Sequence, residues 1–346
     1  MTNEITITRP DDMHLHLRDG AALASVVGTS ASQFARAIVM PNLKPSVTSV
    51  ELALSYRKRI LDCLPEPKKF NPLMTLYLTD NTSPDEIALL AKNEYVHAVK
   101  YYPAGATTNS DQGVTSIERV YPVIEKMADL DVPLLSHGEI SDAEVDIFDR
   151  EEIFIDSVLI PLMGRYPELK IVFEHITTEQ AVQFIEQGPE TIAATITPQH
   201  LMFNRNALLV GGIKSHNYCL PVLKREKHHL ALVTAATSSH TRFFLGTDSA
   251  PHERKTKENA CGCAGIYSAP AAIEFYTEVF ERADALDKLE AFASFNGADF
   301  YRLPRNEEKI IIRKQSWQIP GTVSFADGSC IPLKAGETCS WKIVGP

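Results

Sequence analysis

The sequence predicts an α/β fold, a closed (β/α)₈ or TIM barrel with a small C-terminal appendage. The first observation is a recurring unit, in which a short apolar run is followed by polar residues and a longer segment with helical spacing. The second is that the runs are continuously apolar, as in parallel strands buried on both faces. The third is length, because about eight such units in roughly 250 residues suit a barrel better than an open sheet.

Nine apolar runs compete for the eight strand positions of the barrel. They are Met13–Leu17, Ala37–Met40, Leu73–Leu78, Val96–Val99, Val132–Leu135, Ile171–Phe173, Ala193–Ile196, Tyr218–Leu220 and Phe243–Leu245. One run is surplus. Ala193–Ile196 and Tyr218–Leu220 compete for the seventh position, where we favour the second. Helices are predicted between the runs, several of them opening on capping residues, at Ser49–Leu61, Pro84–Lys92, Ser116–Leu130 and Thr178–Gln187.

The tail of the chain differs from the repeating units. We divide the chain into a barrel, residues 1–308, and a β-rich appendage, residues 309–346, which holds both tryptophans and three turn signals. Short β-like pieces separated by turns predict a small sheet. Because no Pro/Ser-rich linker precedes the tail, it is expected to pack on the barrel, with Ile5–Ile7 pairing with it.

Composition excludes several classes of protein. The 346 residues carry a net charge of −10, which lacks the basic footprint of a nucleic-acid-binding protein. No apolar run reaches 18 residues, so no membrane span is expected, and the N-terminus lacks the apolar core of a signal peptide. Six cysteines, mostly far apart, indicate a reducing compartment. We expect a cytoplasmic protein that gathers positive charge locally for any anionic substrate.

The sharpest local signal is a pair of histidines in the first strand. Residues two apart in a strand share a face, so His14 and His16 would project together into the barrel. Met13, Leu15 and Leu17 would then lie on the opposite face. Two adjacent imidazoles are natural ligands for a borderline divalent metal, although the pair alone fits two structural histidines equally well.

Four further polar residues stand at the ends of predicted strands, where (β/α)₈ barrels place their active sites. Lys100, His137, His175 and Asp248 each end or closely follow an apolar run. From His16 to Lys100 is 84 positions, then 37 to His137, 38 to His175 and 73 to Asp248. These spacings place the ligands on barrel strands 1, 4, 5, 6 and 8.

A lysine in this group needs a chemical explanation, because an ammonium ion has no lone pair for a metal. Its alternatives are a surface lysine or a residue that binds a substrate carboxylate. Burial near cations lowers the pKa of a lysine. A neutral Lys100 amine can add CO₂ to form an anionic carbamate that bridges two metals, the arrangement used for hydrolysis at carbonyl centres.

Several motifs together carry a family resemblance that runs from about Arg9 to Pro270. They are His14-Leu15-His16-Leu17-Arg18-Asp19-Gly20, Met40-Pro41-Asn42, Lys100-Tyr101-Tyr102-Pro103, His137-Gly138-Glu139, Phe173-Glu174-His175-Ile176-Thr177-Thr178 and Gly246-Thr247-Asp248-Ser249-Ala250-Pro251-His252. The chain resembles the amidohydrolase superfamily and, within it, the short monofunctional bacterial dihydroorotases. The resemblance implies two Zn²⁺ per subunit. His14, His16 and Asp248 would hold the more buried ion, His137 and His175 the other, and carboxylated Lys100 (N6-carboxylysine) would bridge them.

The resemblance also implies a reaction and a substrate site. The reaction is the reversible cyclisation of N-carbamoyl-L-aspartate to L-dihydroorotate in pyrimidine biosynthesis, with Asp248 moving the proton. Arg18 can offer a guanidinium fork to the substrate carboxylate, unless it pairs with Asp19. The resemblance adds the side chains of Asn42 and His252 and backbone groups of Leu220 and Ala264 as substrate contacts. It also implies a lid formed by Thr107 and Thr108 in the flexible loop 103–113, and a homodimer.

Two alternative functions stay open on sequence grounds. A relative acting on another cyclic amide, such as a hydantoin or allantoin, is disfavoured by the carboxylate-binding group Arg18, Asn42 and His252. A non-catalytic barrel scaffold predicts the loss of at least one metal ligand, and all six are present. Lys255 and Lys257 are assigned to a solvated loop.

Overall fold

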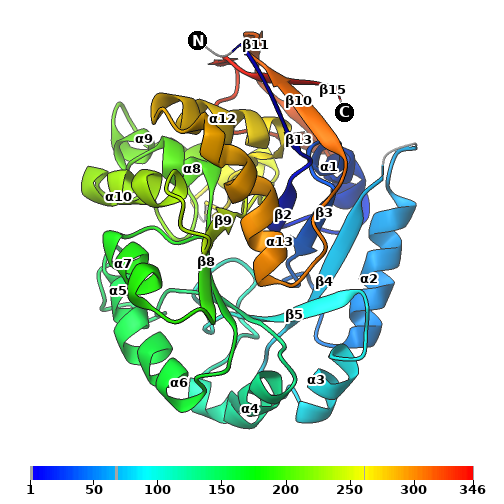
Figure 1. Ribbon diagram of the computed structural model, residues 1–346, viewed down its shortest axis with the longest axis vertical. Coiled ribbons are helices and arrows are strands. Elements are labelled where there is room, and N and C mark those ends of the chain that lie inside the picture. Colours follow the sequence, from blue (N-terminus) through cyan, green and yellow to red (C-terminus); the bar gives the residue numbers. More distant parts are fainter. Residues whose placement is uncertain (1–2, 67–68, 261, 346) are drawn as a thin grey trace.

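Eight parallel strands form the central barrel of the computed structural model, which describes residues 3–66, 69–260 and 262–345 (Figure 1). They are hydrogen-bonded in chain order: β2 (Asp11–Leu15), β3 (Arg36–Val39), β4 (Asn71–Tyr77), β5 (Val96–Tyr101), β6 (Leu134–His137), β7 (Ile171–Glu174), β8 (Ile192–Ile196) and β9 (Phe243–Leu245). The last strand meets the first just beyond β9, where the amide of Asp248 donates to the carbonyl of His14 at 2.9 Å. The predicted (β/α)₈ fold is confirmed.

Helices follow the strands and cover the outside of the barrel (Figure 1). The helices are α1 (Gly20–Gln33), α2 (Val50–Asp62), α3 (Pro84–Leu90), α4 (Tyr121–Asp129), α5 (Arg150–Phe154), α6 (Ile160–Arg165), α7 (Glu179–Gln187), α8 (Pro198–Met202), α9 (Asn206–Leu209), α10 (Glu226–Ala236), α11 (Arg254–Lys257), α12 (Ala272–Arg282) and α13 (Asn296–Phe300). Ser49, Ser83 and Thr178 cap α2, α3 and α7, because each side chain accepts a backbone N–H of the first turn.

The seventh barrel strand is β8, so our preference for Tyr218–Leu220 was wrong. β8 pairs with β7 through Ile171 and with β9 through Phe243, and its five residues are buried. Tyr218–Leu220 lies in a loop. Its Cys219 is buried by packing with Leu223 and other residues of a separate cluster outside the barrel. A short apolar run therefore indicates that a segment is buried, but it does not distinguish a buried loop from a buried strand.

A layer of apolar side chains fills the barrel beneath the polar mouth. Each strand contributes one of them: Met13, Ile38, Leu73, Ala98, Leu135, Val172, Ala193 and Phe244. Helix α13 closes the barrel below this layer, and Phe300, Tyr301 and Leu303 pack against it. A Cβ at Gly297 of α13 would lie only 2.7 Å from the Met13 side chain, so glycine permits this close approach.

The first barrel strand departs from regular alternation. It spans Asp11–Leu15 instead of the predicted Met13–Leu17, and its register with β3 shifts between Asp12 and Leu15. The irregularity corrects a second expectation. Met13 lies in the interior layer, not on the face opposite His14, while Leu15 packs in the outer core. One irregular position thus allows neighbouring residues to contribute to both the apolar layer and the polar mouth.

The tail forms a small β unit on the side of the barrel that holds both termini (Figure 1). Its strands are β1 (Glu4–Thr8), β10 (Lys309–Arg313), β11 (Trp317–Gln318), β12 (Val323–Phe325), β13 (Gly328–Cys330), β14 (Thr338–Cys339) and β15 (Lys342–Gly345). The predicted pairing of Ile5–Ile7 with the tail is confirmed, because β1 pairs antiparallel with β10. Glutamates of α12 hold the tail, with Glu278 accepting from Ser340 and Glu281 from the indole of Trp341.

Among the described residues, no helix is long and apolar enough to span a membrane. The cysteines in the described part of the chain, Cys63, Cys219, Cys263, Cys330 and Cys339, are free thiols. Cys261 lies outside the described residues.

Trp341→Ala tests how tightly the tail is bound to the barrel. Trp341 is fully buried, so truncation should lower the free energy of unfolding by about 3–5 kcal/mol through lost burial and a residual cavity. Chemical denaturation monitored by circular dichroism measures this. Val344→Ala, at a partly exposed position of the same unit, serves as the control. An unfolding midpoint equal to that of the control would contradict the prediction.

Candidate metal centre and active site

A ring of polar side chains lies directly above the apolar layer. Residues two positions further along each strand face the same way. Four of these positions carry the polar side chains Lys100, His137, Glu174 and Thr195, and the fifth is Gly246. Gly246 leaves the room that the ring needs, because a Cβ there would lie 2.7 Å from Thr195 and 3.0 Å from His14. A pocket opens at this C-terminal mouth of the barrel, where His137 of the ring lines it together with His14 and His16.

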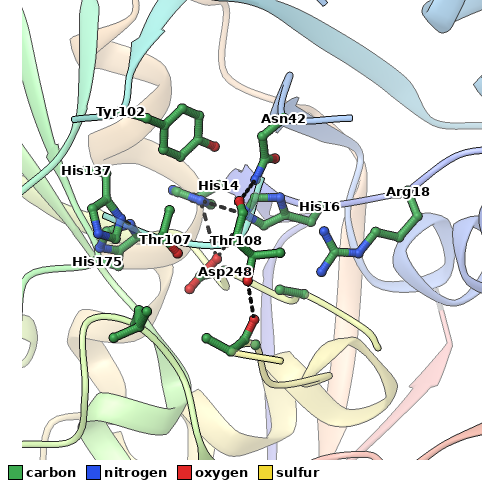
Figure 2. A pocket seen from close by; sticks show the side chains of 14 residues that line it. His14, His16, Arg18, Asn42, Tyr102, Thr107, Thr108, His137, His175 and Asp248 are labelled. Carbon is green, nitrogen blue, oxygen red and sulfur yellow. Dashed lines mark hydrogen bonds and ion pairs between the residues drawn. The ribbon is translucent and has the colours of Figure 1, made fainter. Parts of the chain in front are cut away.

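His14, His16 and Asp248 come together as one candidate metal site (Figure 2). The two imidazole Nε2 atoms lie 3.3 Å apart, and Asp248 Oδ1 is 3.1 Å from His16 Nε2 and 3.4 Å from His14 Nε2. Burial would raise the pKa of Asp248, but its hydrogen bond with His16 and the nearby His14 and Lys100 hold that pKa at about 2. The group therefore offers two nitrogens and an anionic oxygen to one point.

His137 and His175 form a second pair beside the first. His137 Nδ1 lies 3.2 Å from His175 Nε2, and the rings of His14 and His175 are 5.0 Å apart. His175 follows inward-facing Glu174 directly, so a regular strand would turn it outward. A left-handed backbone with φ of 43° instead brings its imidazole back into the mouth, and Asp248 uses the same device at 45°.

Lys100 lies among these groups without a hydrogen-bond partner in the described structure. Its Nζ is fully buried, and burial lowers the pKa of the amine to about 8 although Glu174 and Asp248 act in the opposite direction. Burial of a polar amine without a hydrogen-bond partner costs free energy. Chemical modification of the amine, or its participation in the ligand set of a bound cation, would remove this cost. Imidazoles, a carboxylate and a buried amine without a hydrogen-bond partner, together in one desolvated mouth, fit a divalent metal centre.

Glu174 contacts a candidate metal ligand, although the sequence motif that contains it predicted no role for it. Its carboxylate contacts Nδ1 of His14 and accepts from Thr195 at 2.9 Å, which leaves His14 Nε2 turned towards His16. Glu139 contacts His137 similarly, with 3.2 Å between Oε2 and Nε2, and leaves Nδ1 turned towards His175. Such carboxylate–histidine pairs select the ligating nitrogen. The sequence did contain a signal for this position: Glu174 follows Val172 by two residues, so both would face the barrel interior if the strand is regular.

Arg18 lines the side of the pocket opposite His137 and His175, and His252 contacts it there (Figure 2). Arg18 Nε donates to the carbonyl of Pro251 at 2.9 Å, and its Nη2 lies 3.0 Å from His252 Nε2. The alternative pairing of Arg18 with Asp19 does not occur, because Asp19 pairs with Arg59 at 2.8 Å. Burial and the Arg18 charge lower the pKa of His252 to about 2, so the ring is neutral. The guanidinium has no carboxylate partner within the described residues.

The loop after β5 reaches across the mouth. The Thr108 hydroxyl donates to the carbonyl of Ala264 at 3.3 Å, and the Asn42 amide donates to the carbonyl of Thr108 at 3.1 Å (Figure 2). Thr107 and Leu220 also line the pocket. All predicted substrate and lid residues are thus brought to one mouth, with the loop docked over it.

Tyr102 is a second pocket residue that had no predicted role. It stacks on Tyr77 with 5.1 Å between ring centroids, and Tyr77 in turn donates to the carbonyl of Asn109 in the loop at 3.2 Å. The Tyr102 hydroxyl is buried without a hydrogen-bond partner in the described structure and faces the pocket (Figure 2). Burial raises the pKa of this phenol well above its usual value, so it stays a donor.

The assignment of two lysines to a solvated loop is right for one and wrong for the other. Lys255 is exposed and pairs with Glu253 at 2.9 Å. Lys257 ends the short helix α11 and is only 3% exposed, with its Nζ turned towards backbone carbonyls beside the pocket. Side chains two positions apart on a helix point in different directions. The local sequence therefore did not indicate that one lysine is exposed and the other buried.

Comparison with known proteins agrees with this geometry. The Amidohydrolase family matches residues 8–314. A protein of Nitrosomonas eutropha named dihydroorotase is 61% identical over 345 residues, 99% of this chain and 100% of the relative. The chain belongs to the dihydroorotases of the amidohydrolase family.

Solved structures agree with this family membership. A dihydroorotase from Saccharomyces cerevisiae, in complex with 5-fluoroorotic acid, has a TM-score of 0.92 and 35% identity, covering 99% of both chains. An L-hydantoinase from Arthrobacter aurescens has a TM-score of 0.81 at 13% identity, covering 99% of this chain and 83% of the other. The second likeness shows the shared fold alone. Dihydroorotase family membership implies a metal cofactor, which the donor set at the mouth fits.

Glu174→Gln tests the orienting contact in this dihydroorotase-family site. Replacement of the carboxyl group by an amide should weaken divalent-metal binding, probed with Zn²⁺, about 10- to 100-fold, because the amide fixes the His14 tautomer and ring orientation less firmly. Competition with a chromophoric chelator measures the affinity. Glu168→Gln, at an exposed position, is the matched control. Equal zinc affinity in the two variants would refute the role.

Proposed function

We propose that the barrel mouth interconverts N-carbamoyl-L-aspartate and L-dihydroorotate in pyrimidine biosynthesis. One observation carries the proposal: four histidines, Lys100 and Asp248 meet in a buried mouth beside Arg18, a guanidinium with no acidic partner in the described part of the chain. The first group suits chemistry at an amide carbonyl, and the second suits an acidic substrate.

Two zinc ions are proposed at these donors. His14, His16 and Asp248 would hold one ion, and His137 with His175 the other. A CO₂-derived carbamate on Lys100 would bridge them, for which the buried, unpaired Nζ is the supporting observation. Zinc bound there would supply a Lewis acid for the amide carbonyl and a nucleophilic water at neutral pH.

Asp248 is proposed as the catalytic acid and base. Its pKa of about 2 keeps the carboxylate ionised and ready to accept a proton from the attacking water. In hydrolysis it would pass that proton to the leaving ring nitrogen. In cyclisation the steps reverse: the carbamoyl nitrogen would lose a proton to Asp248 as it attacks the substrate's carboxyl carbon, and Asp248 would return that proton to the departing oxygen, which leaves as water as the C–O bond breaks.

The substrate carboxylate is proposed to bind Arg18, with Asn42 and His252 as neighbours. Backbone groups of Leu220 and Ala264 would contact the ring. Support comes from the pocket lining and from the bond between the Thr108 hydroxyl and the Ala264 carbonyl. Thr107 and Thr108 would close over the bound substrate and exclude water.

A hydantoin or allantoin is the alternative substrate class, and a barrel scaffold is the alternative without catalysis. The unpaired Arg18 guanidinium favours an acid, as does the acidic ligand named for the Saccharomyces relative. A scaffold would not need imidazoles oriented by carboxylates in a buried mouth. The predicted homodimer, cytoplasmic location and division at residue 308 stay predictions.

Substrate assays test the proposal directly. Zinc-loaded protein should hydrolyse L-dihydroorotate, followed by loss of ultraviolet absorbance, because Arg18 complements its carboxylate. Hydantoin and allantoin, which lack that carboxylate, should react at least 100-fold more slowly in kcat/KM. A preference for either control would favour the alternative class, and inactivity towards all three would favour the scaffold.

Lys100→Ala tests the bridging role. The variant should lose dihydroorotate hydrolysis and bind fewer than the two zinc ions expected per native chain, because the shared ligand is absent. Metal analysis by mass spectrometry and the absorbance assay are the measurements. Lys92→Ala, at an exposed lysine, is the control. Full activity with native zinc content would exclude the carbamate.

A further inference from the structure

Lys257 makes an unusual set of contacts for a buried lysine. Its Nζ donates to the carbonyls of Tyr218 at 2.9 Å, Cys263 at 3.0 Å and Gly265 at 2.5 Å. An ammonium group has three N–H donors, so all of them are used on backbone oxygens. Lys257 therefore ties together segments that are far apart in the sequence.

These segments carry the backbone groups at the substrate side of the pocket. Tyr218 precedes Leu220 by two residues, and Cys263 and Gly265 flank Ala264 on both sides. The carbonyl of Ala264 is the acceptor for the Thr108 hydroxyl of the docked loop and lies 2.9 Å from His252 Nε2. The position of one carbonyl thus affects both the loop and a proposed substrate ligand.

The Ala264 segment has little freedom to find this position without the lysine. Gly265 adopts a φ of 146°, and a Cβ there would lie 2.6 Å from the carbonyl oxygen of Ala250 and 2.9 Å from the His252 ring. Its amide donates to the carbonyl of Tyr218 at 3.0 Å, the same oxygen that Lys257 contacts. The two segments and the ammonium form one hydrogen-bonded unit.

The charge of Lys257 is also uncompensated. No acidic side chain of the described residues forms an ion pair with it or with Arg18, although both are near His252. Burial lowers the pKa of Lys257 to about 8, so the amine is still largely protonated at neutral pH. The chain has a net charge of −10, but these two cations make one side of the pocket locally positive. This local charge would attract an anionic ligand.

We infer that Lys257 is a positioning residue for the carboxylate end of the substrate. Its ammonium holds the Ala264 carbonyl where the closing loop needs it, and it adds positive charge beside Arg18. This inference rests on the proposed function, because the ligand whose carboxylate it serves is the proposed substrate. Lys257 itself does not touch the reacting atoms.

Lys257→Met and Lys255→Met form a matched pair for the test. Both variants remove one charge from α11, but Lys255 is exposed and its ammonium pairs with Glu253 at the surface. We expect Lys257→Met to raise the KM for dihydroorotate about tenfold or more, with native zinc content. The rise in KM that Thr108→Val causes should be at least fivefold smaller in the Lys257→Met variant than in the native chain, because the carbonyl that accepts from the Thr108 hydroxyl is already displaced.

Amide hydrogen exchange gives a readout that needs no activity. The Gly265 amide should exchange faster in Lys257→Met than in Lys255→Met, because its acceptor Tyr218 is released. Unchanged exchange, a KM equal to that of Lys255→Met, or fully additive losses with Thr108→Val would overturn the inference. A lower Tm of Lys257→Met together with a fall in kcat and an unchanged KM would show that Lys257 only stabilises the fold, and this result would also overturn the inference.

Two further arms keep the outcomes separable. Where Lys257→Met fails to fold, Lys257→Gln replaces it, because a polar amide suits the surrounding carbonyls better but lacks the charge, the full reach and one of the three donors. Its KM and its Gly265 exchange rate should still exceed those of Lys255→Gln, and values equal to that control would overturn the inference. A native chain that does not hydrolyse dihydroorotate refutes the proposed function, whereas exchange at Gly265 still decides whether Lys257 positions the segment.

Discussion

The burial of titratable side chains at the C-terminal mouth is the constraint on which the rest of the site depends. Parallel strands deliver the polar ends of β5, β6 and β7 to one place, above an apolar layer that excludes water. Burial is the largest cause of the lowered pKa of His14 and of His175. The imidazoles are therefore neutral with free lone pairs, and the desolvation that makes charge costly here creates a ligand set for a cation.

Regular strands could not build this mouth alone. Alternation would place His175 outside once Glu174 faces inward, and would separate Met13 from the layer once His14 faces the pocket. A shift of register in β2 and left-handed residues at His175 and Asp248 overcome this limit. Adjacent residues can then serve as ligand and as orienting partner, which places an extra carboxylate beside His14.

The substrate side follows a different physical logic from the metal side. Its fixed points are backbone carbonyls, held by Lys257 and by a tightly packed glycine, and its charges are cations that have no acidic partner among the described residues. The acidic surplus of the chain therefore lies elsewhere on the molecule. Positive charge is concentrated where an anionic substrate would meet the docked loop, so a protein of net charge −10 can still attract an anion.

From the sequence alone, the recurring apolar runs predicted the barrel, and polar residues at the strand ends and in the motifs predicted six candidate metal ligands and a candidate carboxylate-binding arginine. The three-dimensional fold was needed to show that β8 takes the seventh position, that Glu174 contacts His14 and that Lys257 is buried, because these features depend on partners far along the chain. Glu174 and His14 are 160 positions apart, and burial of Tyr218–Leu220 or Lys257 comes from neighbours that no local pattern records.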